Sequence, residues 1–76
     1  MKDHYAILGI ASDASGDEVR SAYRRKALQF HPDRNTAPEA TDKFRDVQEA
    51  YETLSDVARR YAYDENRRRN LLEKPL

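Results

Sequence analysis

Residues 15–55 decide the fold, and they read SGDEVRSAYRRKALQFHPDRNTAPEATDKFRDVQEAYETLS. Apolar residues in this stretch recur at the three- and four-residue spacings of an amphipathic helix. The first set is Val19, Ala22, Tyr23, Ala27 and Phe30. The second set is Ala40, Phe44, Val47, Tyr51 and Leu54. Because two such helices joined by a short loop pair antiparallel, the stretch predicts a helical hairpin.

The ends of both helices are marked by residues with known end preferences. Ser15 and Glu18 have the spacing of a capping box, in which each side chain accepts a hydrogen bond from the other residue's backbone amide. Pro32 ends the first helix, because the residue before a proline is disfavoured in the helical region. Pro38 and Glu39 suit the first turn of the second helix, where a missing amide costs nothing and an acid meets the positive end of the dipole.

A shorter helix is expected before the hairpin. Residues 5–10 are apolar apart from Gly9, with Asp3 available as a cap and Gly9 as a stop. This pattern predicts one or two helical turns. With the hairpin and a further helix after it, the sequence predicts an all-α fold.

The segment after the hairpin predicts a last short helix and a tail. Ser55-Asp56 can cap this helix, which we expect to run to about Asp64. The side chains that we expect to face inward are Val57, Tyr61 and Ala58. We divide the chain into a domain of residues 1–66 and a basic tail of residues 67–76, which prolongs the helix or is disordered. Pro75 rules out helix at the very end.

Composition limits the kinds of protein that this chain can be. With 76 residues and no cysteine, we expect one small domain that relies on apolar packing, without disulfides or a thiolate zinc site. The two histidines lack further ligands at a known spacing, so we expect no metal and no cofactor. No apolar run has the length of a membrane span and the first residues lack a secretory signal, so we expect a cytoplasmic protein with no membrane contact. We expect the chain to be a monomer as an isolated domain.

The charges cancel overall but are unevenly distributed. Fourteen basic and fourteen acidic residues give a net charge of +0. Basic residues gather in the first hairpin helix at Arg20, Arg24, Arg25 and Lys26, whereas the stretch 39–56 is mainly acidic. The zero net charge and the acidic stretch argue against nucleic-acid binding. A small basic-helix nucleic-acid-binding domain stays the alternative, and binding to random DNA that falls steeply with salt would support it.

The sequence resembles the J domain of the DnaJ co-chaperone family over roughly its first 65 residues. The residues that carry the resemblance are Tyr5-Ala6-Ile7-Leu8-Gly9-Ile10, Ala22-Tyr23-Arg24-Arg25-Lys26-Ala27-Leu28, His31-Pro32-Asp33, Lys43-Phe44, Glu49-Ala50-Tyr51-Glu52-Thr53-Leu54-Ser55-Asp56 and Tyr63-Asp64. A bare His-Pro-Asp tripeptide occurs often by chance. The same tripeptide between two amphipathic helices, with these flanking motifs, is specific.

The resemblance implies a four-helix J domain that is not an enzyme. It would dock on a DnaK-type chaperone in its ATP state and stimulate ATP hydrolysis, which promotes client capture in protein folding. The essential contact would be made by His31, Pro32 and Asp33. The basic docking face would consist of Arg20, Tyr23, Arg24 and Arg25, with Arg34, Asn35 and Phe44 as secondary contacts.

Two residues of the first hairpin helix stand out. Counting 100° per residue, Leu28 points about 180° away from Val19, one turn beyond Arg24. We therefore expect Leu28 on the docking side as an apolar anchor, unless it packs against another helix of this domain. Lys26 lies in the apolar stripe where many J domains have Leu, so its stem should follow the core edge while its ammonium stays in water.

A hydrolase is the enzymatic alternative, because a histidine beside a carboxylate can act as a general base. His31 and Asp33 would be its catalytic pair. No serine, cysteine or metal constellation accompanies them, and a small helical hairpin offers no pocket. Intrinsic ATP turnover by the purified chain would be the signature of this alternative.

Overall fold

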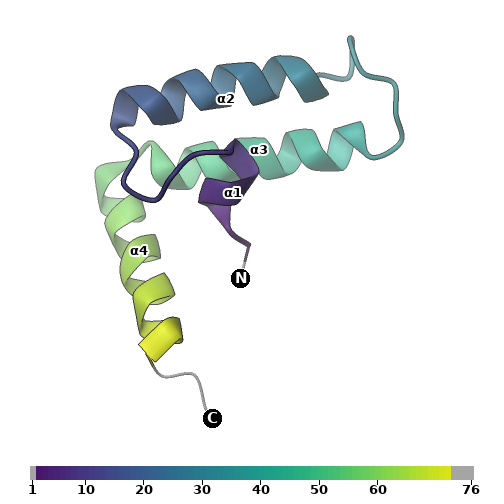
Figure 1. Ribbon diagram of the computed structural model, residues 1–76. Helices are drawn as coiled ribbons and strands as arrows, with labels where there is room; N and C mark the ends of the chain where they lie inside the picture. Colours follow the sequence, from purple (N-terminus) through teal and green to yellow (C-terminus); the bar gives the residue numbers. More distant parts are fainter. Residues whose placement is uncertain (1, 73–76) are drawn as a thin grey trace.

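The computed structural model describes residues 2–72, with side chains described for residues 2–70, and contains four helices. They are α1 (His4–Leu8), α2 (Gly16–Phe30), α3 (Ala40–Leu54) and α4 (Val57–Leu72). Figure 1 shows α2 and α3 lying antiparallel, α1 crossing them near the middle of α3, and α4 leaving the end of α3 in a different direction. The predicted all-α fold with a central hairpin is confirmed.

The predicted ends of α1 and α2 are confirmed by hydrogen bonds. The Asp3 carboxylate accepts a hydrogen bond from the Ala6 amide at 3.1 Å, and Gly9 ends α1 in the left-handed region at φ 72°. That conformation favours glycine, because a side chain would be strained there. Ser15 and Glu18 form a complete capping box, with bonds of 3.1 Å and 3.3 Å.

The start of α3 is defined by backbone hydrogen bonds, and the start of α4 is capped by an aspartate. Pro38 and Glu39 form a turn immediately before α3, which begins at Ala40, slightly later than the sequence suggested. The Glu39 carbonyl accepts the first helical bond, and its side chain makes no capping bond. At α4, the Asp56 carboxylate accepts a bond from the Arg59 amide at 3.0 Å, which is the expected cap.

The core lies where α1 meets the α2–α3 hairpin. Leu8, Val19 and Val47 are the largest fully buried side chains. The remaining members of the core cluster are Tyr5, Ala22, Ala50, Leu54 and Tyr63. Ile7, Ile10, Tyr23, Phe30 and Tyr51 pack partly buried against it. Each predicted stripe thus supplies the core, and the short α1 covers the seam between the two hairpin helices.

The predicted inward face of α4 is wrong. Val57 and Tyr61 are 87% and 68% exposed, and Ala58 is also exposed. The buried residue is Tyr63 at 8%, together with the half-buried Arg60. The apolar pattern misled here, because the inner face of α4 is made of a tyrosine and arginine stems rather than aliphatic side chains.

The helix α4 also extends beyond the predicted end near Asp64 and continues to Leu72. Arg67 lies within it and is half-buried, with its guanidinium 3.4 Å from the Asp3 carboxylate and 5.3 Å from the centre of the Tyr5 ring. These contacts tie the helix to the N-terminal segment. The prediction for Pro75 lies outside the described residues.

Candidate docking site at the tip of the hairpin

The tripeptide His31-Pro32-Asp33 forms a closed turn directly after α2. His31 has extended backbone angles, φ −61° and ψ 130°, as expected for a residue before proline. Its carbonyl accepts hydrogen bonds from the amides of Arg34, at 2.9 Å, and Asn35, at 2.8 Å. The turn is therefore closed by its own backbone, without help from the Asp33 side chain, which is 89% exposed.

Within this turn, the imidazole of His31 is held and the carboxylate of Asp33 is not. The Asp33 amide donates a hydrogen bond to His31 Nδ1 at 3.2 Å, so the neutral ring carries its hydrogen on Nε2. Asp33 Oδ2 lies 3.7 Å from Nδ1, beyond hydrogen-bond distance, and the Asp33 side chain is 89% exposed. On its other side, the His31 ring meets the Phe44 ring edge-on at 5.5 Å.

The contact with Phe44 is a feature that the sequence did not reveal. Phe44 was predicted as a stripe residue and a secondary contact, separate from the tripeptide. The register of the hairpin brings it against His31. Phe44 is half-buried but does not pack against the core cluster, so its contact in the described structure is with the imidazole rather than with the core. No spacing rule links positions 31 and 44, because they lie on opposite sides of the loop.

Asn35 braces the same loop. Its side-chain amide donates to the Gln29 carbonyl at 3.2 Å, and its side-chain oxygen accepts from the Ala37 amide at 3.0 Å. These two bonds connect the end of α2 with the chain entering α3. Asn35 therefore has a structural role in the loop, and its predicted role as a partner contact stays a prediction.

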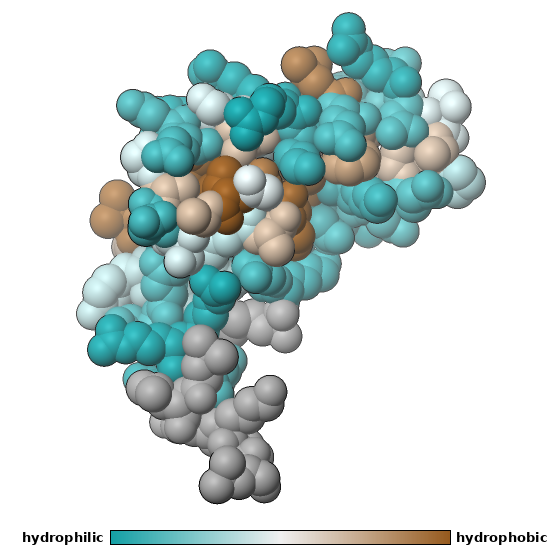
Figure 2. All heavy atoms as spheres, in the orientation of Figure 1, coloured by the Kyte–Doolittle hydropathy of each residue, from teal (hydrophilic) through white to brown (hydrophobic). Residues whose placement is uncertain are grey.

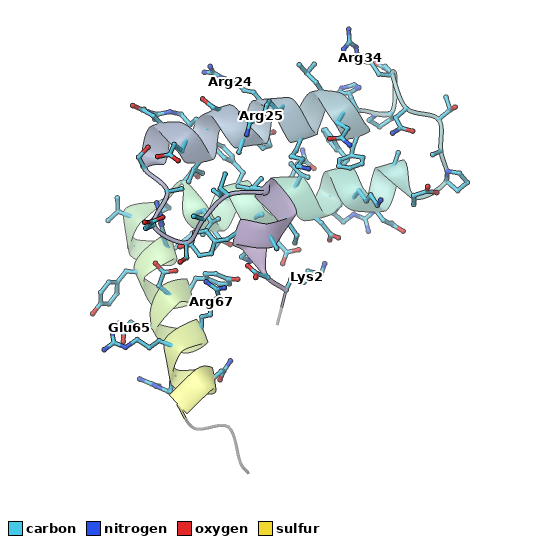
Figure 3. The ribbon with its side chains drawn as sticks, in the orientation of Figure 1. Lys2, Arg24, Arg25, Arg34, Glu65 and Arg67 are labelled. Carbon is cyan, nitrogen blue, oxygen red and sulfur yellow. The ribbon has the colours of Figure 1, made fainter. Side chains whose placement is uncertain are left out.

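Basic side chains continue the site along the outer face of α2. Arg20, Arg24 and Arg25 are exposed, and Arg34 is exposed in the loop. In Figure 3, Arg24 and Arg34 project on the side of α2 that is remote from α3. Arg20 forms a salt bridge with Asp17 one turn earlier, so part of its charge is already neutralised within the helix.

Leu28 and Tyr23 differ in how much of each side chain packs inside the domain. Leu28 is 57% exposed, so it is not a core residue. Tyr23 is half-buried, and its ring stacks on Tyr51 of α3 at a centroid distance of 4.1 Å. One face of the Tyr23 ring is therefore occupied inside the domain.

The described residues do not assemble a metal site or a membrane helix. Residues 2–70 contain no cluster of three or more His, Cys, Asp or Glu side chains that could hold a metal ion. Of the two histidines, His4 is buried against Tyr63 and His31 lies in the hairpin loop. No helix in the described part of the chain is long and apolar enough to cross a bilayer.

A four-helix fold with an exposed His-Pro-Asp turn at the tip of its hairpin defines the J-domain class of co-chaperones. The sequence matches the DnaJ domain family over residues 3–64, and the chain belongs to that family. J domains generally partner with DnaK-type (Hsp70) chaperones and stimulate their ATPase, and they are not themselves catalytic.

Individual relatives agree with this assignment. The chain is 53% identical over 64 residues to the chaperone protein DnaJ of Pediococcus pentosaceus, a match that covers 84% of this chain and 17% of that protein. It is 52% identical over 64 residues to DnaJ homolog subfamily B member 5 of Homo sapiens, covering 84% of this chain and 18% of that protein. The chain thus spans 17–18% of the length of these curated relatives.

Solved structures share the fold. The solution structure of the J-domain from human DnaJ subfamily C member 12 matches with a TM-score of 0.79 and 30% sequence identity. The match covers 99% of this chain and 67% of that chain.

Proposed function

We propose that this chain docks on a DnaK-type chaperone in its ATP state and stimulates ATP hydrolysis, which promotes capture of client proteins. The essential contact is made by His31, Pro32 and Asp33. The basic face of Arg20, Tyr23, Arg24 and Arg25 supports it, Leu28 is its apolar anchor, and Arg34, Asn35 and Phe44 are secondary contacts. We propose that the chain acts as a monomer in the cytoplasm and without nucleic acid.

The observation that carries the proposal is the contrast between a fixed turn and an exposed carboxylate. The backbone of the turn is closed by two hydrogen bonds to the His31 carbonyl. The Asp33 side chain is 89% exposed and makes no hydrogen bond to the His31 ring, whose nearest nitrogen is 3.7 Å away. A carboxylate presented on a rigid turn loses little entropy on binding, so it suits a charge-assisted bond to a cation of the partner.

The surroundings of the turn fit a docking surface better than a catalytic centre. The arginines near it are exposed, which favours long-range attraction to an acidic partner surface. The loop is braced by Asn35 from inside, so the tripeptide keeps its shape before the partner arrives. Preorganisation of this kind improves affinity without additional contacts.

Single-turnover ATP hydrolysis by a DnaK-type chaperone, with and without this chain, tests the proposal. We expect stimulation by the unaltered chain and its loss in Asp33→Asn, which keeps the shape of the side chain but removes its charge. His31→Gln should lose stimulation as well. Both variants should unfold in urea within about 0.5 kcal/mol of the unaltered chain, because these side chains lie outside the core.

Two results would count against the proposal. One is full stimulation by folded Asp33→Asn, and the other is ATP turnover by the chain alone. A variant that ends at residue 66 tests whether residues 67–76 are needed for stimulation. It also lacks the contact between Arg67 and Asp3. We expect it to keep the stimulation of the longer chain.

A further inference from the structure

A cleft opens between α1, α2 and α3, away from the exposed row of Arg24 and Leu28. Its volume is about 280 Å³, and its lining consists of Ile7, Lys26, Phe30, Lys43, Asp46 and Val47. The cleft borders α1, over which Figure 2 shows apolar residues gathered between hydrophilic ones. Its floor is apolar and its only ionised groups are two amines and one carboxylate.

The carboxylate of the cleft, Asp46, already forms a salt bridge with a lysine that does not line the cleft. Asp46 Oδ1 accepts a hydrogen bond from Lys2 Nζ at 2.6 Å, and Lys2 also approaches Glu49 at 3.7 Å. In Figure 3, Lys2 extends from the N-terminal segment beneath α1. Asp46 is therefore engaged by a lysine that does not line the cleft.

The two amines of the cleft have no such partner. Within residues 2–70, neither Lys26 nor Lys43 forms a salt bridge. Lys43 Nζ lies 5.4 Å from the centre of the Phe30 ring, above the apolar floor. Lys26 is half-buried in the inner stripe of α2, and its Cε lies 3.6 Å from the point where a Cβ added to Gly9 would lie, so its stem runs beside the end of α1. Lys43 is exposed and Lys26 is half-buried, so both ammonium groups reach water at the rim of the cleft. An anion at this rim would meet two positive charges that no carboxylate of the described residues pairs.

We propose that this cleft binds a small carboxylate with an apolar body, which goes beyond the chaperone-stimulating function. The carboxylate pairs with Lys26 and Lys43, and the body lies on Ile7, Phe30 and Val47. The volume equals that of about nine water molecules, which suits a ligand of about ten non-hydrogen atoms. Charge and shape are then complementary, because each polar group of the ligand meets an unpaired amine and the remainder displaces water from the floor.

Octanoate is the probe for this site, and 1-octanol is its neutral counterpart of the same length. Each is titrated into the isotope-labelled chain while backbone amide shifts are followed by NMR. We expect octanoate to shift amides near Ile7, Phe30 and Val47 and to bind at least about fivefold more tightly than octanol. Equal affinities for the two probes would overturn the proposal, as would shifts centred on Leu28 or Tyr61.

Variants test whether octanoate binding depends on Lys26 and Lys43 themselves or only on the net charge of the chain. Lys26→Met and Lys43→Met keep the length of the side chain and should each weaken octanoate binding by up to about fivefold, with octanol unaffected. The double variant should bind both probes equally. Arg59→Met removes the same charge at an exposed position of α4 and should leave octanoate binding unchanged. Unchanged octanoate affinity in the double variant, with its fold intact by NMR, would refute the site.

Discussion

At position 28 a leucine lies on the outer face of α2, beside the basic residues rather than in the core. Its side chain is 57% exposed, so replacement by alanine leaves no internal cavity. We predict that Leu28→Ala changes the free energy of unfolding by less than about 0.5 kcal/mol. If Leu28 is an anchor whose water is expelled on docking, the same change weakens chaperone binding by about 1–2 kcal/mol.

A urea melt and a binding titration on the one variant test this prediction. Val57→Ala is the matched control, because Val57 is also an exposed aliphatic residue, at 87%, but lies on α4. It should change neither quantity. Normal chaperone affinity in Leu28→Ala would remove Leu28 from the docking site.

His4 is a buried residue whose protonation the fold opposes. Its side chain is 7% exposed and stacks on Tyr63 at 4.6 Å, and its Nδ1 has no hydrogen-bond partner. Burial lowers the pKa of His4 below its usual 6.5, and the positive charge of Lys2 acts in the same direction. The carboxylates of Glu49, Asp3 and Asp46 oppose the shift without cancelling it.

A lowered pKa makes stability depend on pH in a defined direction. Below pH 6.5 the unfolded chain takes up a proton at His4 that the folded chain resists, so stability falls with the pH. Above pH 6.5 the full stability is present. We predict that His4→Phe, which keeps the ring stacking, reduces the fall in the urea midpoint between about pH 6.5 and 5. Val57→Ala, at an exposed position of α4, is the control and should retain this fall. An unaltered slope in His4→Phe would exclude His4 as its cause.

At the scale of elements, α4 is attached to the domain by arginines rather than by an aliphatic face. Arg60 Nε donates to the Tyr5 hydroxyl at 3.1 Å, and Arg60 Nη2 donates to the carbonyls of Ser12, at 3.2 Å, and Ala14, at 2.6 Å. The Tyr5 hydroxyl in turn donates to Asp64 at 2.6 Å. Burial and this last bond raise the pKa of Tyr5, so the phenol stays protonated and keeps donating.

Neighbouring arginines on α4 therefore predict a contrast in stability. Arg60→Met removes three hydrogen bonds from a half-buried guanidinium and should cost about 2 kcal/mol of unfolding free energy. Arg59→Met, at an exposed neighbouring position, should cost less than about 0.5 kcal/mol. Urea denaturation of both variants measures the difference, and equal stabilities would show that these bonds do not anchor the helix.

At the scale of the whole molecule, charges are separated although the net charge is +0. Exposed arginines lie on α2 and also on α4, whereas exposed carboxylates such as Asp42, Glu49 and Glu52 lie on α3. A partner with an acidic surface would therefore be attracted to the α2 side of the hairpin rather than to its α3 side. The orientation of this charge separation depends on the hairpin, which directs the two outer faces away from each other.

Reversing charge on α2 tests this arrangement. We predict that Arg20→Glu with Arg24→Glu weakens chaperone binding at low salt and reduces its dependence on salt, because screened attraction is replaced by repulsion. Arg59→Glu with Arg68→Glu changes the net charge equally but on α4, so it should have a smaller effect. Equal effects of the two double variants would indicate that net charge matters and that the α2 face does not.

The sequence by itself determined the two helices of the hairpin, the caps of α1 and α2 and the position of the tripeptide, because helix periodicity, capping and proline geometry are local. It also predicted Leu28 on the outer face, since that follows from the rotation of one helix. Only the tertiary structure decided which face of α4 is buried. Tyr63 and Arg60 face inward because they form hydrogen bonds with His4 and Tyr5 of α1, which are distant in the sequence. The contact of His31 with Phe44 and the cleft between Lys26 and Lys43 likewise depend on the register of α2 against α3. Contacts between residues distant in the chain are fixed by packing, so they cannot be predicted from the local sequence pattern.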